Sequence, residues 1–210
     1  DLSGKAPDGD RRFLSLNHAT FGEIYLAHRR RIGEAGFDLF IPNEKLEQAH
    51  AALAAAAEAV GGGRVGWRAL EIARVEAGAP RYGVDMDESN LAPETGIADE
   101  AISYSKGCYI GQEVIARIRT YGRVSKSLCG LRLADDLKLL PVKGDLLFCG
   151  EKKVGHITSA VQTPRSKANL ALGYVRRESN EAGSELTLRS EGGGSVAIVA
   201  EQLSRLSPPV

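Results

Sequence analysis

Asn169-Leu170-Ala171-Leu172-Gly173-Tyr174-Val175 is one of several short, mostly apolar runs after Ser127 that the sequence predicts to be β-strands. Turns that contain glycine or proline separate these runs. Many short strands at this spacing are typical of a small barrel or sandwich. We therefore predict an α+β fold with two domains, 1–125 and 126–210, the second a small antiparallel β-barrel. The other predicted strands after Ser127 are 128–133, 145–148, 153–158, 185–188 and 195–199.

Before Ser127 the sequence predicts a mixture of helices and strands. Asn43 is placed to cap the first helix, whose interior is mostly alanine and which ends at a run of glycines. From the third helix, Val114, Ile115 and Ile118 are expected to face inward. The predicted strands are 21–26 and 37–41, the helices 43–60, 66–77 and 111–120, and the loops 1–12 and 81–104.

The overall charge argues against one large class of partners. The 210 residues carry 27 Lys and Arg against 27 Asp and Glu, so the formal net charge is zero. A general nucleic-acid binder needs a basic face, and no apolar run approaches the roughly 20 residues of a membrane span. We predict neither nucleic acid nor membrane as a partner. Because the chain begins at Asp1 and its only methionine is Met86, we expect that it is processed, truncated or short of N-terminal sequence.

The three cysteines, Cys108, Cys129 and Cys149, are an odd number at wide spacing. This is neither a disulfide framework nor a paired zinc-ligand pattern, so no metal site is predicted. A reducing compartment is the simplest interpretation: the cytoplasm of a bacterium or, for a eukaryotic protein, the mitochondrial matrix. Cys129 and Cys149 lie in strand-like runs and are expected to be buried.

The octapeptide Lys106-Gly107-Cys108-Tyr109-Ile110-Gly111-Gln112-Glu113 places a cysteine just before the third predicted helix. A thiol near a lysine and a helix start ionises more easily than one in a core. Cys108 is therefore a candidate reactive sulfur, with Lys106 favouring its thiolate. The alternative is that Cys108 is a small apolar residue filling a gap, as most free cysteines are.

This octapeptide resembles the signature of the YgfZ-type folate-binding proteins, relatives of the glycine-cleavage T-protein that support iron–sulfur enzymes. Similar segments of this chain are 33–38, 73–83, 155–159 and 171–175. The resemblance implies the later part of a T-protein-like α/β folate-binding region, followed by a small C-terminal β-barrel. It also implies that the N-terminal part of that region is absent.

The resemblance also implies a set of site residues. Glu76 would meet the pterin ring, since a carboxylate can accept two N–H bonds from an amino-pyrimidinone edge. Arg117 suits the carboxylates of the folate tail. The alternatives are a solvated helix-end glutamate and ordinary helix charge, and Arg74 has the alternative of pairing with acids on its helix. Arg74, Tyr109 and Gln112 complete the predicted folate contacts. Arg119, Arg123 and Arg29-Arg30-Arg31 are weaker basic candidates.

Two functions follow from the resemblance. The first is a tetrahydrofolate-binding accessory protein for iron–sulfur cluster assembly or repair, with tetrahydrofolate or a one-carbon derivative as cofactor and iron–sulfur client or assembly proteins as partners. The second is an enzyme, a folate-dependent aminomethyltransferase like the T-protein. Arg31 and Cys108-Tyr109 favour the first, because the T-protein has tyrosine and aspartate-phenylalanine there. A third alternative is a barrel-containing interaction protein with a degenerate pocket.

Overall fold

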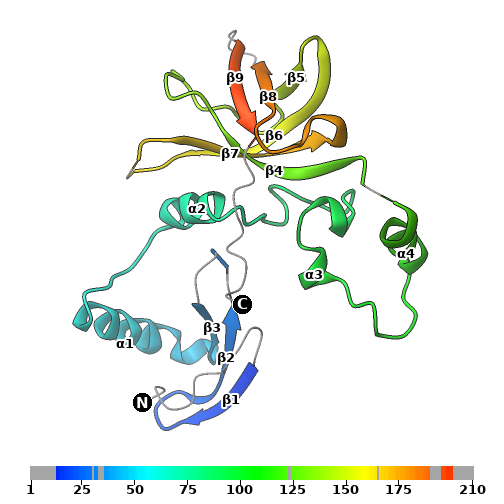
Figure 1. The fold of residues 1–210 in the computed structure, drawn as a ribbon. Coiled ribbons are helices and arrows are strands. Elements are labelled where there is room, and N and C mark those ends of the chain that lie inside the picture. The colour runs from blue at the N-terminus through cyan, green and yellow to red at the C-terminus, as the bar shows by residue number, and fades with distance from the viewer. Residues whose placement is uncertain are drawn as a thin grey trace. The chain divides into compact units, whose positions relative to one another are not determined.

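The computed structural model describes residues 13–29, 31–32, 36–122, 124–164, 166–189 and 195–200, with the backbone alone at Tyr121 and over 195–200. By compactness the chain divides into two units, Asp1–Leu70 and Glu71–Val210 (Figure 1). The domain border expected near residue 125 stays a prediction. The described elements combine helices with antiparallel sheets, as the predicted α+β class requires.

The first unit contains a three-stranded antiparallel sheet in the order β1-β2-β3. Ile24 and Leu26 are two residues apart, so they lie on the same face of β2, and both are buried; Tyr25 between them lies on the opposite face. The strand β1 was not predicted, although Leu14 and Leu16 alternate with polar residues there. The strands are β1 (Phe13–His18), β2 (Gly22–Arg29) and β3 (Gly36–Phe40).

Helix α1 (Leu46–Ala59) follows the short 3₁₀ turn η1 (Asn43–Lys45). The prediction that Asn43 caps this helix is wrong. The chain makes a 3₁₀ turn first, with the Lys45 N–H donating to Pro42 O at 3.0 Å, so Lys45 takes the cap position and no side chain caps the helix. The predicted end is confirmed, since Gly61 adopts a left-handed φ of +77°.

Among the described residues after α1, three helices and two 3₁₀ turns accompany the barrel; α2 crosses the border between the two units, and the others lie in the second unit. Helix α4 lies where the sequence predicted it, but Val114 is 42% exposed, so its predicted inward orientation is wrong; Ile115 and Ile118 are half-buried. The predicted loop 81–104 is ordered by two short helical turns and a bridge between Tyr82 and Met86. The elements are α2 (Trp67–Glu76), η2 (Ala92–Glu94), α3 (Ala98–Ala101), α4 (Gln112–Tyr121) and η3 (Arg177–Ser179).

The predicted barrel is confirmed. It is closed and antiparallel in the order β4-β7-β6-β5-β8-β9, and its strands run from green to red in Figure 1. Among the described residues its core is a cluster of nine buried apolar side chains, of which each fully buried Leu, Ile or Val contributes about 1.5–3 kcal/mol. The strands are β4 (Lys126–Arg132), β5 (Leu146–Cys149), β6 (Lys152–Gln162), β7 (Asn169–Arg176), β8 (Glu185–Arg189) and β9 (Ser195–Ala200).

Glycines allow β6 and β7 to approach closely. A Cβ at Gly155 would collide with Tyr174 O, and one at Gly173 would lie 2.7 Å from His156 O. Gly173 pairs with Ile157, directly beside an irregularity in the register of the two strands between Ile157 and Ser159. Within the part of the chain that the structure describes, no helix has the length and apolar character needed to cross a bilayer.

Candidate functional site

Glu76 is the last residue of α2 and is exposed. Two hydrogen bonds close the helix behind it: Gly78 N–H donates to Val75 O at 3.0 Å, and Ala79 N–H donates to Arg74 O at 2.8 Å. Gly78 has a φ of +65°, which glycine adopts without strain. The backbone around Glu76 is therefore held in place while its carboxylate remains accessible to a ligand.

Arg74 is 5% exposed, and hydrogen bonds engage all five of its N–H groups. Nε donates to Glu71 Oε2 at 2.8 Å. Nη1 donates to Ala79 O at 3.2 Å and to Asp85 Oδ2 at 2.7 Å. Nη2 donates to Ser159 Oγ at 2.7 Å and to Glu71 Oε1. Burial lowers the pKa of Arg74, but the hydrogen bonds with Glu71 and the charge of Asp85 outweigh it and raise the pKa.

Asp85 accepts four hydrogen bonds although it is 2% exposed. Oδ2 accepts from Arg74 and from Arg81 N–H at 3.0 Å, while Oδ1 accepts from Thr158 Oγ1 at 2.6 Å and Ser159 Oγ at 2.7 Å. We call Glu71, Arg74, Asp85, Thr158 and Ser159 the α2–barrel clasp, because they join α2, the following loop and β6. The structure shows the alternative weighed for Arg74, pairing with an acid of its own helix, at Glu71; its second partner, Asp85, lies in the following loop and is buried against the barrel.

Sequence reasoning missed the rest of this clasp. A buried carboxylate is recognised by its partners, and those partners are distant along the chain: 73 residues separate Asp85 from Thr158, and 74 separate it from Ser159. One sequence signal was present. Thr158 and Ser159 are adjacent hydroxyls between the apolar residues Ile157 and Ala160 of β6, where buried polar groups need hydrogen-bond partners.

The octapeptide 106–113 forms the turn that leads into α4. Tyr109 N–H donates to Gln112 Oε1 at 3.2 Å, and Gln112 N–H donates to Tyr109 O at 3.2 Å. Gly111 precedes the helix with a φ of +88°, which explains the glycine there. Gln112 is therefore used to order the turn, and its role as a folate contact stays a prediction.

Cys108 is exposed, as a reactive thiol must be. The Lys106 ammonium lies 4.8 Å from the centroid of the Tyr109 ring, a cation–π distance. Cys108 makes no hydrogen bond to any residue that the structure describes, and no contact with Lys106 is seen among them. The expectation that Cys108 fills a gap in the core is not met, whereas its reactivity stays a prediction.

The basic candidates are spread out. Arg117 is exposed on α4, and Arg119 lies 4.0 Å from the centroid of the Tyr104 ring. Arg31 pairs with Asp38 at 2.6 Å, while Arg30 and Arg123 lie outside the described residues. Among the described residues, no hydrogen bond or ion pair joins the α2 group of Arg74 and Glu76 to the octapeptide or to Arg117. A single folate pocket made by all these residues stays a prediction.

The other two cysteines differ from each other. Cys129 packs against the barrel core, and burial raises the pKa of its thiol to about 11, so it is protonated at neutral pH. Cys149 is exposed, so the prediction of burial is wrong for it. It is the last residue of β5 and pairs with Lys152 of β6 across the hairpin turn in which Gly150 has a φ of +59°.

Tyr174 lies on the barrel with its ring stacked on His156 at 5.6 Å between centroids. The Lys126 ammonium lies 4.8 Å from the Tyr174 ring centroid and 3.8 Å from Glu94. Tyr174 is 2% exposed and its hydroxyl has no partner among the described residues. Burial and the charge of Glu94 raise its pKa, so the phenol stays neutral. The pKa of His156 is lowered chiefly by burial and, to a smaller extent, by the positive charge of Lys126.

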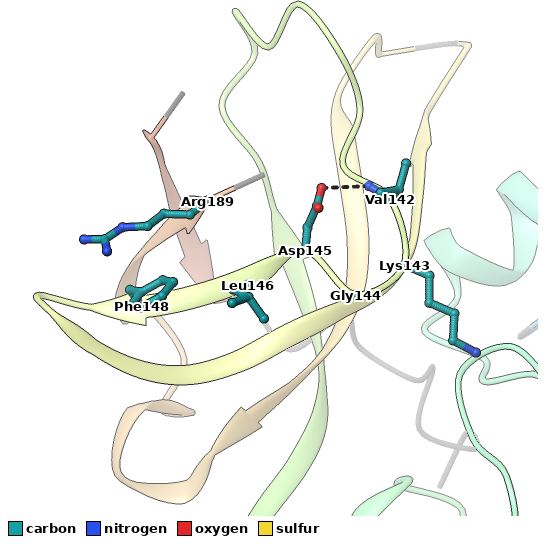
Figure 2. A pocket seen from close by; sticks show the side chains of 7 residues that line it. All are labelled: Val142, Lys143, Gly144, Asp145, Leu146, Phe148 and Arg189. Atoms are coloured by element: carbon teal, nitrogen blue, oxygen red, sulfur yellow. Dashed lines mark hydrogen bonds between the residues drawn. The ribbon is translucent and has the colours of Figure 1, made fainter. Parts of the chain in front are cut away.

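An open depression of about 560 Å³ lies at the β5 end of the barrel (Figure 2). Asp145 Oδ2 accepts from Val142 N–H at 2.9 Å, and Arg189 stacks on Phe148 at 4.1 Å from the ring centroid. Figure 2 shows the Lys143 side chain extending away from Arg189 and Phe148. None of the predicted site residues lines the depression. Its lining residues are Val142, Lys143, Gly144, Asp145, Leu146, Phe148 and Arg189.

The architecture, a helix clasped to a closed six-stranded barrel, is that of an aminomethyltransferase-type fold. The crystal structure of the glycine cleavage system aminomethyltransferase T from Bartonella henselae superposes with a TM-score of 0.72. The match covers 92% of this chain and 54% of that chain at 21% sequence identity. At this identity the comparison shows the fold alone.

Two family models assign the chain by sequence. Residues 6–105 match the GCVT N-terminal domain, and residues 126–203 match the glycine cleavage T-protein C-terminal barrel domain. The chain therefore consists of aminomethyltransferase-like domains of the glycine cleavage T-protein family. The more specific assignment to YgfZ-type proteins belongs to the proposal below.

Curated relatives agree with this family. The aminomethyltransferase of Aquifex aeolicus is 28% identical over 82% of this chain and 45% of its own length. That of Thermosynechococcus vestitus is 30% identical over 79% and 43%. A chloroplastic protein of Arabidopsis thaliana, named "Putative transferase", is 32% identical over 70% and 32%. The chain thus spans less than half the length of these relatives.

Proposed function

We propose that this protein binds tetrahydrofolate or a one-carbon derivative, with the Glu76 carboxylate accepting the N–H groups of the pterin edge. The observation that carries the proposal is the exposed Glu76 carboxylate on a helix end that is closed by two hydrogen bonds and anchored by the buried Arg74. A fixed carboxylate can present both oxygens to a flat donor edge, which is the geometry of bidentate recognition.

Calorimetric titration with 5-formyl-tetrahydrofolate tests the binding site. We expect micromolar affinity in the unaltered protein and a loss of at least about tenfold in Glu76→Ala, because two charge-assisted hydrogen bonds disappear. Glu58→Ala is the matched control, since Glu58 is likewise exposed in the last turn of a helix. Equal affinity of Glu76→Ala and the unaltered protein would remove Glu76 from the site.

The role of the bound folate, in this proposal, is to support iron–sulfur cluster assembly or repair. Its support is Cys108, which is exposed within the octapeptide that resembles the YgfZ-type signature. A solvent-accessible thiol can exchange with or bind sulfur-containing groups, whereas a buried thiol cannot. The partners would be iron–sulfur client or assembly proteins, in the bacterial cytoplasm or an organelle interior.

Complementation separates this role from simple folate binding. In cells that depend on this protein, Cys108→Ala should lower the activity of iron–sulfur enzymes while folate affinity and folding are retained. Cys149→Ala is the matched control, because Cys149 is also an exposed thiol but lies on the barrel. Full enzyme activity with Cys108→Ala would overturn the iron–sulfur role and leave the folate site standing.

The second candidate is a folate-dependent aminomethyltransferase. It is favoured by the names of the curated relatives, which include the aminomethyltransferases of Aquifex aeolicus and Thermosynechococcus vestitus. Purified protein that releases ammonia from an aminomethyl-lipoyl carrier in the presence of tetrahydrofolate would support this candidate over the accessory role. We expect no such activity, because Cys108-Tyr109 replaces the aspartate-phenylalanine of the T-protein.

A further inference from the structure

The buried polar groups of Arg74, Asp85 and Ser159 in the α2–barrel clasp are used within the protein, so they offer no hydrogen bond to a ligand. All five N–H groups of Arg74 are used within the protein, and Asp85 accepts four hydrogen bonds. The Ser159 hydroxyl both accepts from Arg74 and donates to Asp85. Because these groups are already satisfied, the contribution of the clasp to function has to be geometric.

The clasp acts on the residues on either side of Glu76. Arg74 Nη1 donates to Ala79 O, and Ala79 N–H donates to Arg74 O, so a pair of hydrogen bonds brackets Glu76. Its immediate neighbour Val75 is fully buried and packs with Val161 and Leu172 of the barrel. The backbone at Glu76 is thereby tied to β6 and β7 while its side chain remains exposed.

We propose that Arg74, Asp85 and Ser159 are positioning residues that hold the Glu76 carboxylate in its binding orientation. This inference rests on the proposed function, in which Glu76 meets the pterin edge of a folate. Ordering a helix end on binding would weaken affinity, whereas a helix end that is already ordered by folding does not incur that loss. The barrel then contributes to the affinity for folate without touching the ligand.

Ser159→Ala is the test variant. It removes the hydroxyl that links the helix to β6, but keeps the charge pair of Arg74 and Asp85, so the fold is expected to persist. Thr163→Ala is the matched control: Thr163 is 3% exposed just after β6, and its hydroxyl bonds Ser166 and Ala168 N–H within the barrel. Both variants remove one buried hydroxyl, and only one of them touches the clasp.

Two measurements carry the test. In calorimetry with 5-formyl-tetrahydrofolate, Ser159→Ala should lose about tenfold in affinity and Thr163→Ala less than about twofold. In a Glu76→Gln background, which keeps affinity measurable, Ser159→Ala should add less than about twofold, because its effect passes through Glu76. In hydrogen exchange without ligand, the amides of Gly78 and Ala79 should exchange faster in Ser159→Ala than in the unaltered protein. In Thr163→Ala their exchange rates should be the same as in the unaltered protein.

The possible failures are distinguishable. If the unaltered protein binds no folate, the proposed function fails, and the exchange of Gly78 and Ala79 still decides whether the clasp orders the helix end. If the protein binds folate through Glu76 but Ser159→Ala binds equally well, the positioning role alone is overturned. The same holds if Ser159→Ala costs as much in the Glu76→Gln background as in the unaltered protein, since that is a general effect on the fold.

Discussion

At the scale of single residues, Asp85 lies buried between α2 and β6 and accepts hydrogen bonds from a guanidinium, a backbone amide and two hydroxyls. Its partners are fixed in the folded protein and absent from an unfolded chain. Arg74 needs Asp85 in turn, because a guanidinium that is 5% exposed cannot be solvated by water. Removing Asp85 would leave the half-buried Glu71 as the remaining carboxylate partner of Arg74 among the described residues, and a buried charge that loses part of its pairing is destabilising.

Asp85→Ala should therefore destabilise the protein by about 3 kcal/mol, because Arg74 keeps only Glu71 as a carboxylate partner among the described residues, and Arg74 Nη1 and Arg81 N–H each lose an acceptor. Urea unfolding followed by circular dichroism measures this loss. Asp87→Ala, two residues on at an exposed position, should cost less than about 1 kcal/mol. Equal losses in the two variants would contradict the importance that we assign to the buried carboxylate.

The surroundings of His156 predict how the stability of the folded protein changes with pH. Burial and the charges of Lys126, Lys153 and Lys143 lower its pKa in the folded protein below the unfolded value of about 6.5. The unfolded state therefore binds a proton more readily, and the stabilisation is fully present above about pH 6.5 and lost as the pH falls from there towards the folded pKa. His156→Gln should flatten the stability profile between about pH 5 and 7. An unchanged slope would show that another group causes it.

At the scale of elements, glycines and pairing partners decide which predictions succeed. The ends of α1 and α2 were predictable because glycine is the residue that most often follows a helix, and Gly61 and Gly78 do adopt the left-handed φ angles that end one. The start of α1 was predicted wrongly. Asn43 begins a 3₁₀ turn, and Lys45 at the end of that turn occupies the position before the helix. The barrel strands were predicted because apolar runs and turn glycines alternate at a short period.

Gly155 gives a prediction at this scale, since β6 and β7 pair there without room for a side chain. A Cβ would collide with Tyr174 O, a backbone atom that cannot move without breaking the ladder. Gly155→Ala should cost about 3 kcal/mol or more in urea unfolding. Gly63→Ala is the control, because a Cβ there meets nothing within 4 Å, and it should change stability by less than about 1 kcal/mol. A tolerated Gly155→Ala would mean that the strands are farther apart.

At the scale of the whole molecule, the two units differ in how much apolar core they hold. The described part of the barrel buries a cluster of nine apolar residues, whereas the described part of the first unit buries Ile24, Leu26, Ala49 and Ala54. Because stability follows buried apolar surface, the barrel should be the last part to open.

Native-state hydrogen exchange measures this difference directly. We expect the amides of β6 and β7 to exchange only by global unfolding, and those of β1 to β3 to exchange at a lower free energy through local opening. Increasing urea concentrations separate the two routes, since global unfolding exposes more surface and depends more steeply on denaturant. Equal protection in both units would show that they unfold as one cooperative body.

The sequence by itself determined the α+β class, the positions of most helices and strands, and the barrel, because these depend on local periodicity and turn residues that a single chain displays. Only the tertiary structure decided the surroundings of Arg74, the exposure of Cys149 and the partners of Asp85. Those depend on contacts between residues far apart in sequence, such as Asp85 and Ser159. Hydrogen-bond partners leave no periodic signal, so a buried ion pair becomes visible only when the chain has brought its members together.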